Sequence, residues 1–198
     1  LEAPEFVLLD VNELAEGRSY CQVGSIAVSP DDNLLAYSVD FVGRRIYSIF
    51  IKNLETGEVY QNEISTANGE ITWANDNKTI FYTVQEEETL RDYRIYRHEL
   101  GTSTDKDVLV FEEKDETFGV TIGKSKDKKY LLIHCFSTLT NDCYYIDANN
   151  PHETPASILP REREHEFNIE HFHNVWYIYT NKNAQNFSLL SAPFENPQ

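Results

Sequence analysis

The sequence contains no methionine and only three cysteines among its 198 residues. Because a natural chain starts with methionine, we expect this one to be an interior or processed part of a longer polypeptide. Cys21, Cys135 and Cys143 are odd in number and show no C-x-x-C spacing, which argues against a dense secreted disulfide scaffold. Cys135 lies in an apolar run, where a free cysteine packs as a small core residue. We therefore expect a reducing, cytoplasmic location.

Long apolar runs and clustered basic residues are also missing. No run approaches the roughly 20 residues that a helix needs to cross a bilayer, and the N-terminus lacks the features of a secretory signal. Lys and Arg number 17 against 33 Asp and Glu, which gives a net charge of −16. Nucleic acid and anionic membranes need clustered basic residues, so neither partner is expected. The excess acid either keeps the protein soluble or attracts basic ligands.

Glycine is sparse and scattered. The eight glycines form no phosphate-cradling loop, so the sequence predicts no nucleotide cofactor.

A polar stretch followed by a β-branched or aromatic run occurs four times at intervals of 45 to 50 residues, with the copies starting at Ser29, Ala74, Lys124 and Ile169. Asp and Asn favour turns, whereas Val, Ile, Tyr and Phe favour strands. Each copy therefore predicts a turn that leads into a strand. The strands expected before the turns are residues 25–28, 70–73, 119–122 and 167–169. The third strands are expected at residues 46–51, 93–98, 143–146 and 187–190, and weaker fourth strands at residues 59–64, 108–111 and 156–159.

Four strands in a unit of about 45 residues is the spacing of propeller blades. One blade cannot bury both faces of its sheet, but stacked blades bury them against each other. The main alternative is a β-sandwich, which would show short strands without a recurring unit. The sequence therefore predicts an all-β fold, a partial β-propeller of about four four-stranded antiparallel blades.

A short helix is expected before the first blade. Residues 10–16 begin with an aspartate cap, contain good helix formers and end before Gly17. We therefore divide the chain into a lead-in, residues 1–19, and a partial propeller, residues 20–198, with blades at about residues 20–66, 67–114, 115–163 and 164–198. Such a fragment would leave two blade faces bare, so we expect it to self-associate, to be mobile at its ends or to be only marginally stable.

Residues 119–123 (GVTIG) imitate the G-x-S-x-G nucleophile elbow, with Thr121 in place of serine. An elbow needs a strand, a strained turn and then a helix. Here a lysine-rich turn follows instead, so we interpret the segment as a core strand. No catalytic residue is assigned.

His165, His171 and His173 lie close together, with Glu164, Glu166 and Glu170 among them. Two histidines on one strand face, with an acidic neighbour, could hold a metal ion. No H-E-x-x-H spacing is present, so a polar turn at residues 169–174 is the favoured interpretation and no metal site is assigned.

Two charged runs also invite a functional interpretation. Residues 86–88 are three glutamates in an expected loop, where charge runs are usually solvated, although they could receive a basic peptide. Residues 161–166 alternate in sign, which favours a self-neutralising linker over an interdomain contact.

Several stretches, in chain order, resemble the N-terminal propeller region of the oligopeptidase B (protease II) enzymes of the prolyl oligopeptidase family. They are residues 8–12 (LLDVN), 27–31 (AVSPD), 40–45 (DFVGRR), 53–57 (NLETG), 72–76 (TWAND), 110–115 (VFEEKD) and 159–166 (LPREREHE). The resemblance covers nearly the whole chain and agrees with the repeats.

The resemblance implies a serine-type endopeptidase that hydrolyses short peptides after Lys or Arg, without metal or cofactor. It also implies that the catalytic α/β-hydrolase domain follows the propeller and is absent from this chain, so substrate-binding residues stay unassigned. The propeller would have seven blades, cover the active site and act as gate and scaffold. Partners would be that C-terminal domain and short basic peptides. The alternative is a stand-alone propeller that binds other proteins without enzymatic activity.

Overall fold

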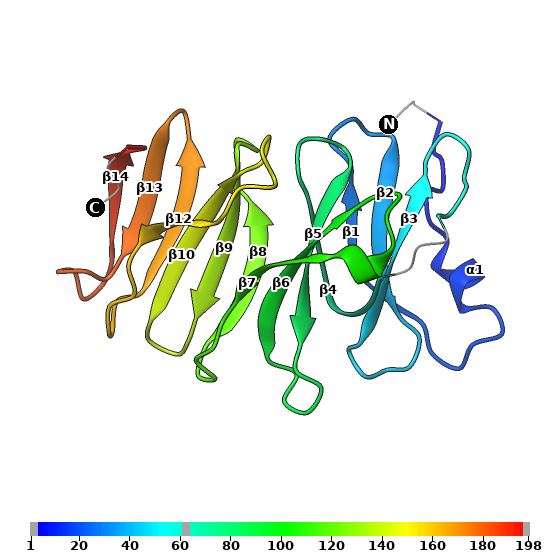
Figure 1. The fold of residues 1–198 in the computed structure, drawn as a ribbon, viewed down its shortest axis with the longest axis horizontal. Coiled ribbons are helices and arrows are strands. Elements are labelled where there is room, and N and C mark those ends of the chain that lie inside the picture. Colours follow the sequence, from blue (N-terminus) through cyan, green and yellow to red (C-terminus); the bar gives the residue numbers. More distant parts are fainter. Residues whose placement is uncertain (1–3, 61–63, 196–198) are drawn as a thin grey trace.

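The computed structural model describes residues 4–60 and 64–195. In these residues, fourteen strands form three antiparallel sheets of seven, four and three strands, accompanied by one short α-helix and one 3-10 turn. The sheets follow one another along the long axis of the molecule, from the N-terminal to the C-terminal end (Figure 1). The all-β class predicted from the sequence is confirmed. In the described part of the chain, no helix is long and apolar enough to cross a membrane.

The first sheet has the strand order β1-β2-β3-β4-β5-β6-β7. Its strands are β1 (Gln22–Val28), β2 (Leu34–Asp40), β3 (Tyr47–Asn53), β4 (Ile64–Trp73), β5 (Thr79–Gln85), β6 (Asp92–Glu99) and β7 (Val108–Glu112). The 3-10 turn η1 (Thr104–Lys106) precedes β7. The second sheet contains β8 (Gly119–Lys124), β9 (Tyr130–Phe136), β10 (Asn141–Asp147) and β11 (Ala156–Leu159). The third contains β12 (Phe167–Phe172), β13 (Val175–Thr180) and β14 (Ser188–Pro193).

Strand β4 joins the first two sequence repeats into one sheet. Its beginning pairs with β3, where Ala67 lies opposite Tyr47, and its end pairs with β5. The expected boundary between residues 66 and 67 therefore falls inside a single strand. The strand expected at residues 59–64 is not seen as such: Val59 forms an isolated bridge with Lys52, residues 61–63 lie outside the described residues, and Ile64 already belongs to β4.

Gly69 allows β4 to change partners. Its φ of +105° is a conformation that side-chain-bearing residues rarely adopt, and an added Cβ would lie 3.0 Å from the ring of Tyr47. The hydroxyl of Ser38 donates a hydrogen bond of 2.7 Å to the Gly69 carbonyl oxygen. The chain can therefore cross here from one half of the sheet to the other while the Ser38 hydroxyl satisfies the Gly69 carbonyl oxygen.

The turns between the first and second strands of the first three repeats share one geometry. Asp32, Asn77 and Lys128 each have a φ near +60° at the same turn position. This alignment places the third repeat one residue later than the sequence spacing predicted. The fourth repeat differs, because β12 and β13 are joined by His173 and Asn174 alone, both at positive φ as in a tight hairpin. The polar turn expected at residues 169–174 is therefore wrong for its first four residues, which belong to β12.

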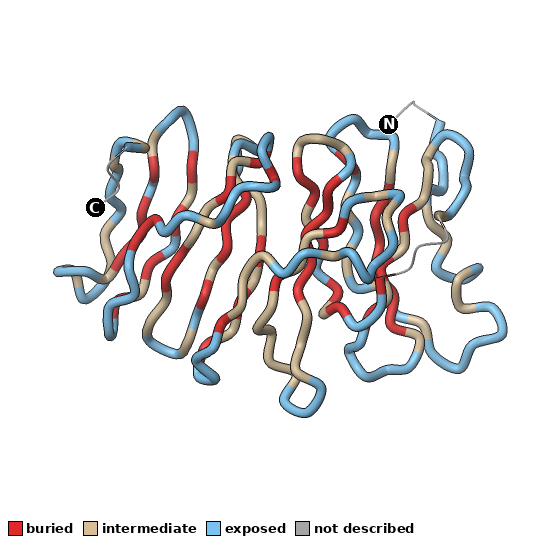
Figure 2. The backbone as a smooth tube through the Cα atoms, viewed as in Figure 1, coloured by how far each residue is buried: buried red, intermediate tan, exposed pale blue. Residues whose placement is uncertain are grey.

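Buried residues occur along strands of all three sheets (Figure 2), and the apolar ones among them form clusters. One core cluster lies between the two halves of the first sheet, around Ile49, Trp73 and Ile80. A second joins the first and second sheets, and a third joins the second and third sheets around Leu132 and Trp176. This packing of successive sheets is what the repeat pattern predicted.

The two ends of the stack differ. Helix α1 (Val11–Ala15), capped by the Asp10 carboxylate, lies in the lead-in, and Leu9 and Leu14 pack on the outer core of the first sheet. The expectation of a bare face is therefore wrong at this end, because the lead-in contacts it. At the other end, Tyr179 and Leu189 of the third sheet are 46% and 67% exposed.

Candidate functional site

The segment between β11 and β12, residues 160–166, contains the alternating charged run and His165, one of the three candidate histidines. We call it the connector. Arg161 donates from Nε to Asp142 Oδ1 at 2.8 Å and from a terminal nitrogen to Glu113 Oε2. Its guanidinium also lies 3.6 Å from the ring centroid of Phe118. These partners come from the segment after β7 and from β10. The prediction of a self-neutralising linker is therefore wrong for Arg161. Arg161 instead ties the connector to the first two sheets.

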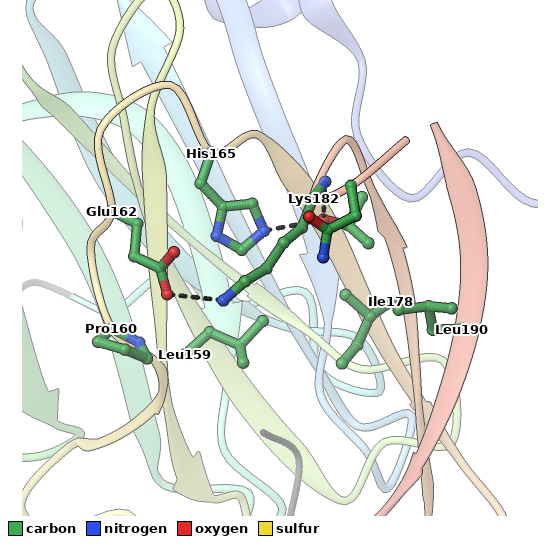
Figure 3. A pocket seen from close by; sticks show the side chains of 9 residues that line it. Leu159, Pro160, Glu162, His165, Ile178, Lys182 and Leu190 are labelled. Atoms are coloured by element: carbon green, nitrogen blue, oxygen red, sulfur yellow. Dashed lines mark hydrogen bonds and ion pairs between the residues drawn. The ribbon is translucent and has the colours of Figure 1, made fainter. Parts of the chain in front are cut away.

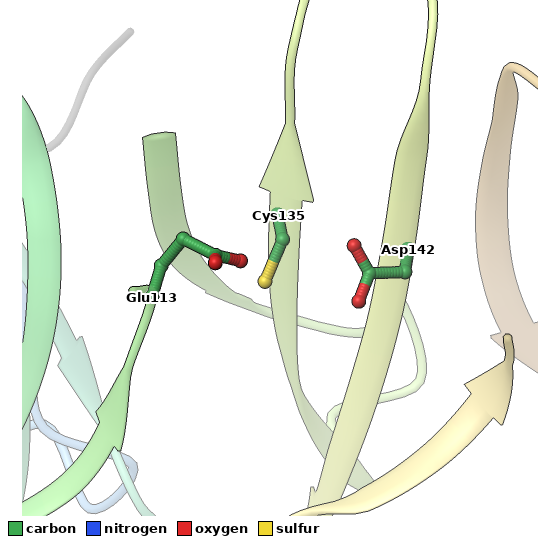
Figure 4. Close-up of side chains that lie close together, drawn as sticks. All are labelled: Glu113, Cys135 and Asp142. Atoms are coloured by element: carbon green, nitrogen blue, oxygen red, sulfur yellow. The ribbon is translucent and has the colours of Figure 1, made fainter. Parts of the chain in front are cut away.

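Glu113, Cys135 and Asp142 form the one group of potential metal ligands found among the described residues (Figure 4). All three side chains are buried. The cation between the two carboxylates is the Arg161 guanidinium, which already contacts both. Burial raises the pKa of the Cys135 thiol, so this sulfur is neither a ready ligand nor a nucleophile. The group is an ion-pair node that holds the sheets together.

The structure separates the three histidines of the sequence cluster. His171 lies on β12, fully buried, with Nδ1 at 2.8 Å from Asp127 Oδ2 in the turn before β9. Its ring packs edge-on against Tyr130 and Trp176. His173 lies in the tight turn and is exposed. Since the histidines do not share one strand face, the arrangement considered for a metal ion does not form.

His165 lines a pocket of about 260 Å³ between the connector and strands β13 and β14 (Figure 3). Its Nε2 lies 2.8 Å from Thr180 Oγ1, whereas Nδ1 has no hydrogen-bond partner in the described part of the chain. Burial lowers the pKa of His165, so the ring is neutral at neutral pH. Lys182 Nζ and Glu162 Oε1 pair at 2.8 Å at the pocket rim. Around them the walls are apolar, formed by Leu159, Pro160, Ile178 and Leu190.

Neither Thr180 nor Thr121 forms a nucleophile–base–acid relay. Thr180 Oγ1 accepts from the Lys182 amide and contacts His165, but no carboxylate among the described residues bonds to the other ring nitrogen of His165. Thr121 lies on β8, as predicted, and donates to Glu70 Oε2 at 2.6 Å. Strand β8 continues through a turn into β9 and not into a helix, so the local geometry of a nucleophile elbow is missing.

The glutamate run at residues 86–88 lies between β5 and β6, as predicted. Glu86 is occupied by Arg91, whose Nη2 lies 2.5 Å from Oε1, and this hydrogen bond lowers the pKa of the Glu86 carboxyl. Arg91 also donates to the backbone carbonyls of Asp115 and Phe118. The first glutamate therefore stabilises a loop. Glu87 and Glu88 are exposed.

Sequence reasoning missed the partners of Arg161 and His171 because they are distant in the chain. It also gave no role to Lys124, whose Nζ donates to Asn75 Oδ1 at 2.9 Å between two repeat turns. Burial, followed by the charge of Lys128, lowers the pKa of Lys124 to about 8. The only signal in the sequence is the recurrence of polar residues at equivalent turn positions.

Curated relatives match the chain along almost its full length. It is 40% identical over 195 residues to dipeptidyl aminopeptidase BI of Pseudoxanthomonas mexicana and 34% identical over 198 residues to protease 2 of Moraxella lacunata. Each match includes 98% of this chain but only 27% and 28% of the relative's own length.

Solved structures show the same fold. Oligopeptidase B from Leishmania major superposes with a TM-score of 0.91 at 32% identity, covering 96% of this chain and 27% of the other. Oligopeptidase B from Trypanosoma brucei, in a closed form with covalently bound antipain, superposes with a TM-score of 0.90 at 29% identity, covering 100% and 28%. The family described as "Prolyl oligopeptidase, N-terminal beta-propeller domain" matches residues 1–198. The resemblance inferred from the sequence is thus confirmed, and the chain belongs to the N-terminal β-propeller domain family of the prolyl oligopeptidases.

Proposed function

We propose that this chain is the gating and scaffolding part of a serine oligopeptidase, in which it covers a catalytic α/β-hydrolase domain and restricts access to small peptides. One observation carries the proposal. The whole chain matches the propeller domain of a peptidase family, and it spans little more than a quarter of the length of its curated relatives. The described residues contain buried ion pairs and packing histidines but no nucleophile with its base. This division of roles supports a separate catalytic domain.

The complete propeller would have seven blades, of which this chain supplies about four, with boundaries near residues 114 and 163 and with the first two repeats joined through β4. The seven-stranded sheet accounts for two repeats, since β4 serves both. The exposed Tyr179 and Leu189 support the continuation, because a further blade would cover this face. The pocket beside His165 borders β14, whose outer edge has no partner strand in the described residues.

For the substrate, we propose short peptides cut after Lys or Arg, without a cofactor. The net charge of −16 supports this choice, since an acidic shell concentrates basic peptides near the entrance. A cytoplasmic location agrees with the three free cysteines, two of them buried. A second candidate is removal of dipeptides from free N-termini, favoured by the 40% identity to a protein named dipeptidyl aminopeptidase.

Two chromogenic substrates distinguish these possibilities in the full-length protein. An N-terminally blocked arginyl amide reports cleavage within a peptide, and an unblocked dipeptidyl amide ending in arginine reports dipeptide removal. We expect cleavage of the blocked substrate, inhibited by a serine-directed reagent. Cleavage of the unblocked substrate alone supports the second candidate. No cleavage of either substrate by a folded protein favours the stand-alone interaction module.

A further inference from the structure

A second pocket, of about 450 Å³, lies between the second and third sheets at the end where β9 turns into β10. Strands from both sheets and the end of the connector form its walls. Its volume is within the range of sites that hold small ligands or single side chains. The residues that matter for its chemistry are His134, Phe136, Glu166, Asn168 and Phe187.

Part of the polar lining is used by the fold itself. The Asn141 side chain accepts from the Phe167 amide at 2.8 Å and donates to the Phe167 carbonyl oxygen at 2.6 Å. Ser137 Oγ donates to the Thr140 carbonyl oxygen, and Thr140 Oγ1 accepts from the Glu164 amide. These bonds tie the start of β12 to β10. They give the pocket a rigid frame and leave its other polar groups available.

Three other side chains that line the pocket have hydrogen-bond acceptors with little or nothing bound to them. The Glu166 carboxylate has only a distant contact, 3.4 Å from Asn181 Nδ2, and forms no ion pair within the described residues. The side chains of Asn168 and His134 form no hydrogen bond in the same part of the chain. Burial lowers the pKa of His134, so at neutral pH its ring is uncharged and offers one acceptor nitrogen.

The pocket also has aromatic surface and lacks positive charge. Phe136 is 46% exposed, and Phe187 stacks on Tyr179 with ring centroids 5.0 Å apart. Of the residues that the structure describes, no Lys or Arg lines the pocket. A carboxylate, two neutral acceptors and aromatic rings are the groups that a planar guanidinium requires, because it donates in several directions and stacks on rings.

We propose that this pocket binds the side chain of an arginine in a peptide. Glu166 accepts from the guanidinium, Asn168 and His134 accept from its remaining N–H groups, and Phe136 provides the stacking surface. The assignment of this arginine to a peptide rests on the proposed function, whereas the binding of an arginine side chain follows from the pocket itself. A propeller that holds a basic residue here retains the rest of the peptide beside the sheets.

Binding is tested on the full-length protein after its active serine has been blocked by an irreversible reagent. Isothermal titration with Nα-acetyl-arginine amide measures affinity, and the citrulline analogue serves as the uncharged control ligand. Glu166→Gln removes the charge, and Glu164→Gln is the matched control in the connector, because within the described part of the chain the Glu164 carboxylate pairs only with Arg163, at 3.5 Å. Asn168→Asp adds a carboxylate at an exposed strand position and should not impair folding.

We expect one arginine site that Glu166→Gln weakens about tenfold and Asn168→Asp strengthens several-fold, with Glu164→Gln unchanged. The citrulline analogue should not bind this site. The affinity of the site for Nα-acetyl-arginine amide should fall as the salt concentration rises. Equal affinity of the wild type and all three variants overturns the proposal, as does equal binding of citrulline. If the unblocked enzyme does not cleave basic peptides while this variant pattern holds, the proposed substrate is wrong and the arginine pocket stands.

Discussion

Replacing Arg161 by methionine should destabilise the chain more than any other single loss of surface charge. The side chain of Arg161 is 30% exposed, but those of Glu113 and Asp142 are only 8% and 3% exposed. Methionine retains part of the packing on Phe118 and removes the cation, which leaves two carboxylates buried and facing each other. Breaking a buried ion pair by removing one partner costs about 3–5 kcal/mol. Because Arg161 is partly solvated, we expect about 2–3 kcal/mol.

Urea unfolding followed by tryptophan fluorescence measures this effect on the 198-residue chain. Trp73 lies in the first sheet and Trp176 in the third, so the two residues report on the sheets on either side of the Arg161 ion pairs. With a slope of about 2 kcal/mol per molar urea, the midpoint should fall by about 1 M. Arg163→Met is the control, since Arg163 is 92% exposed and should shift the midpoint very little.

Two further measurements separate lost charge from lost packing. Adding Glu113→Gln and Asp142→Asn to Arg161→Met should recover much of the stability, because no buried charge then lacks a partner. Burial raises the pKa of Asp142, which its hydrogen bond to Arg161 opposes. Without Arg161 the folded pKa rises further, so protonation stabilises the variant at low pH and its deficit grows as pH increases. Equal midpoints for Arg161→Met and Arg163→Met would refute the reasoning.

The remaining predictions concern backbone strain, pH and association. Gly69→Ala should cost about 1–3 kcal/mol, because φ is +105° and the new Cβ meets Tyr47, whereas Gly123→Ala, with no contact within 4 Å, should be nearly neutral in the same urea assay. Burial lowers the pKa of His165, so its contribution to stability is complete above about pH 6.5 and is lost as pH falls. His165→Gln should therefore show a smaller loss of stability between pH 7 and 5 than the wild type, and an unchanged loss would contradict this. Leu189→Lys, on the exposed face of the third sheet, should reduce self-association measured by light scattering. Val42→Lys, on a loop of the first sheet, is the control and should not reduce it. A wild type that is monomeric at all concentrations would contradict this expectation.

Most strands could be predicted because their determinants are local. Residues 130–136 and 156–159 combine β-branched, aromatic and leucine side chains between turn residues, and the structure forms β9 and β11 there. The continuity of β4 was missed because it depends on Gly69, Ser38 and Tyr47, which meet only after folding. The tight turn after β12 has a signal in the sequence, since Asn174 tolerates positive φ, but the repeat spacing points to a longer turn over residues 169–174.

The charged residues could be located but not paired. Alternating signs at residues 161–166 suggested local neutralisation, and Arg163 with Glu164 follows that rule. Arg161 instead finds carboxylates 19 and 48 residues away, which no local pattern encodes. Similarly, His171 pairs with Asp127 because two sheets pack together. The histidine cluster in the sequence therefore disperses into separate structural contacts.

The proposed function requires a serine nucleophile in a domain outside this chain. The most direct test is to label the active full-length protein with a fluorophosphonate and to locate the modified residue by peptide mass spectrometry. We predict complete inactivation with a single label on a serine outside residues 1–198. A label on Thr121, or on any hydroxyl within these residues, accompanied by loss of activity would contradict the proposed function.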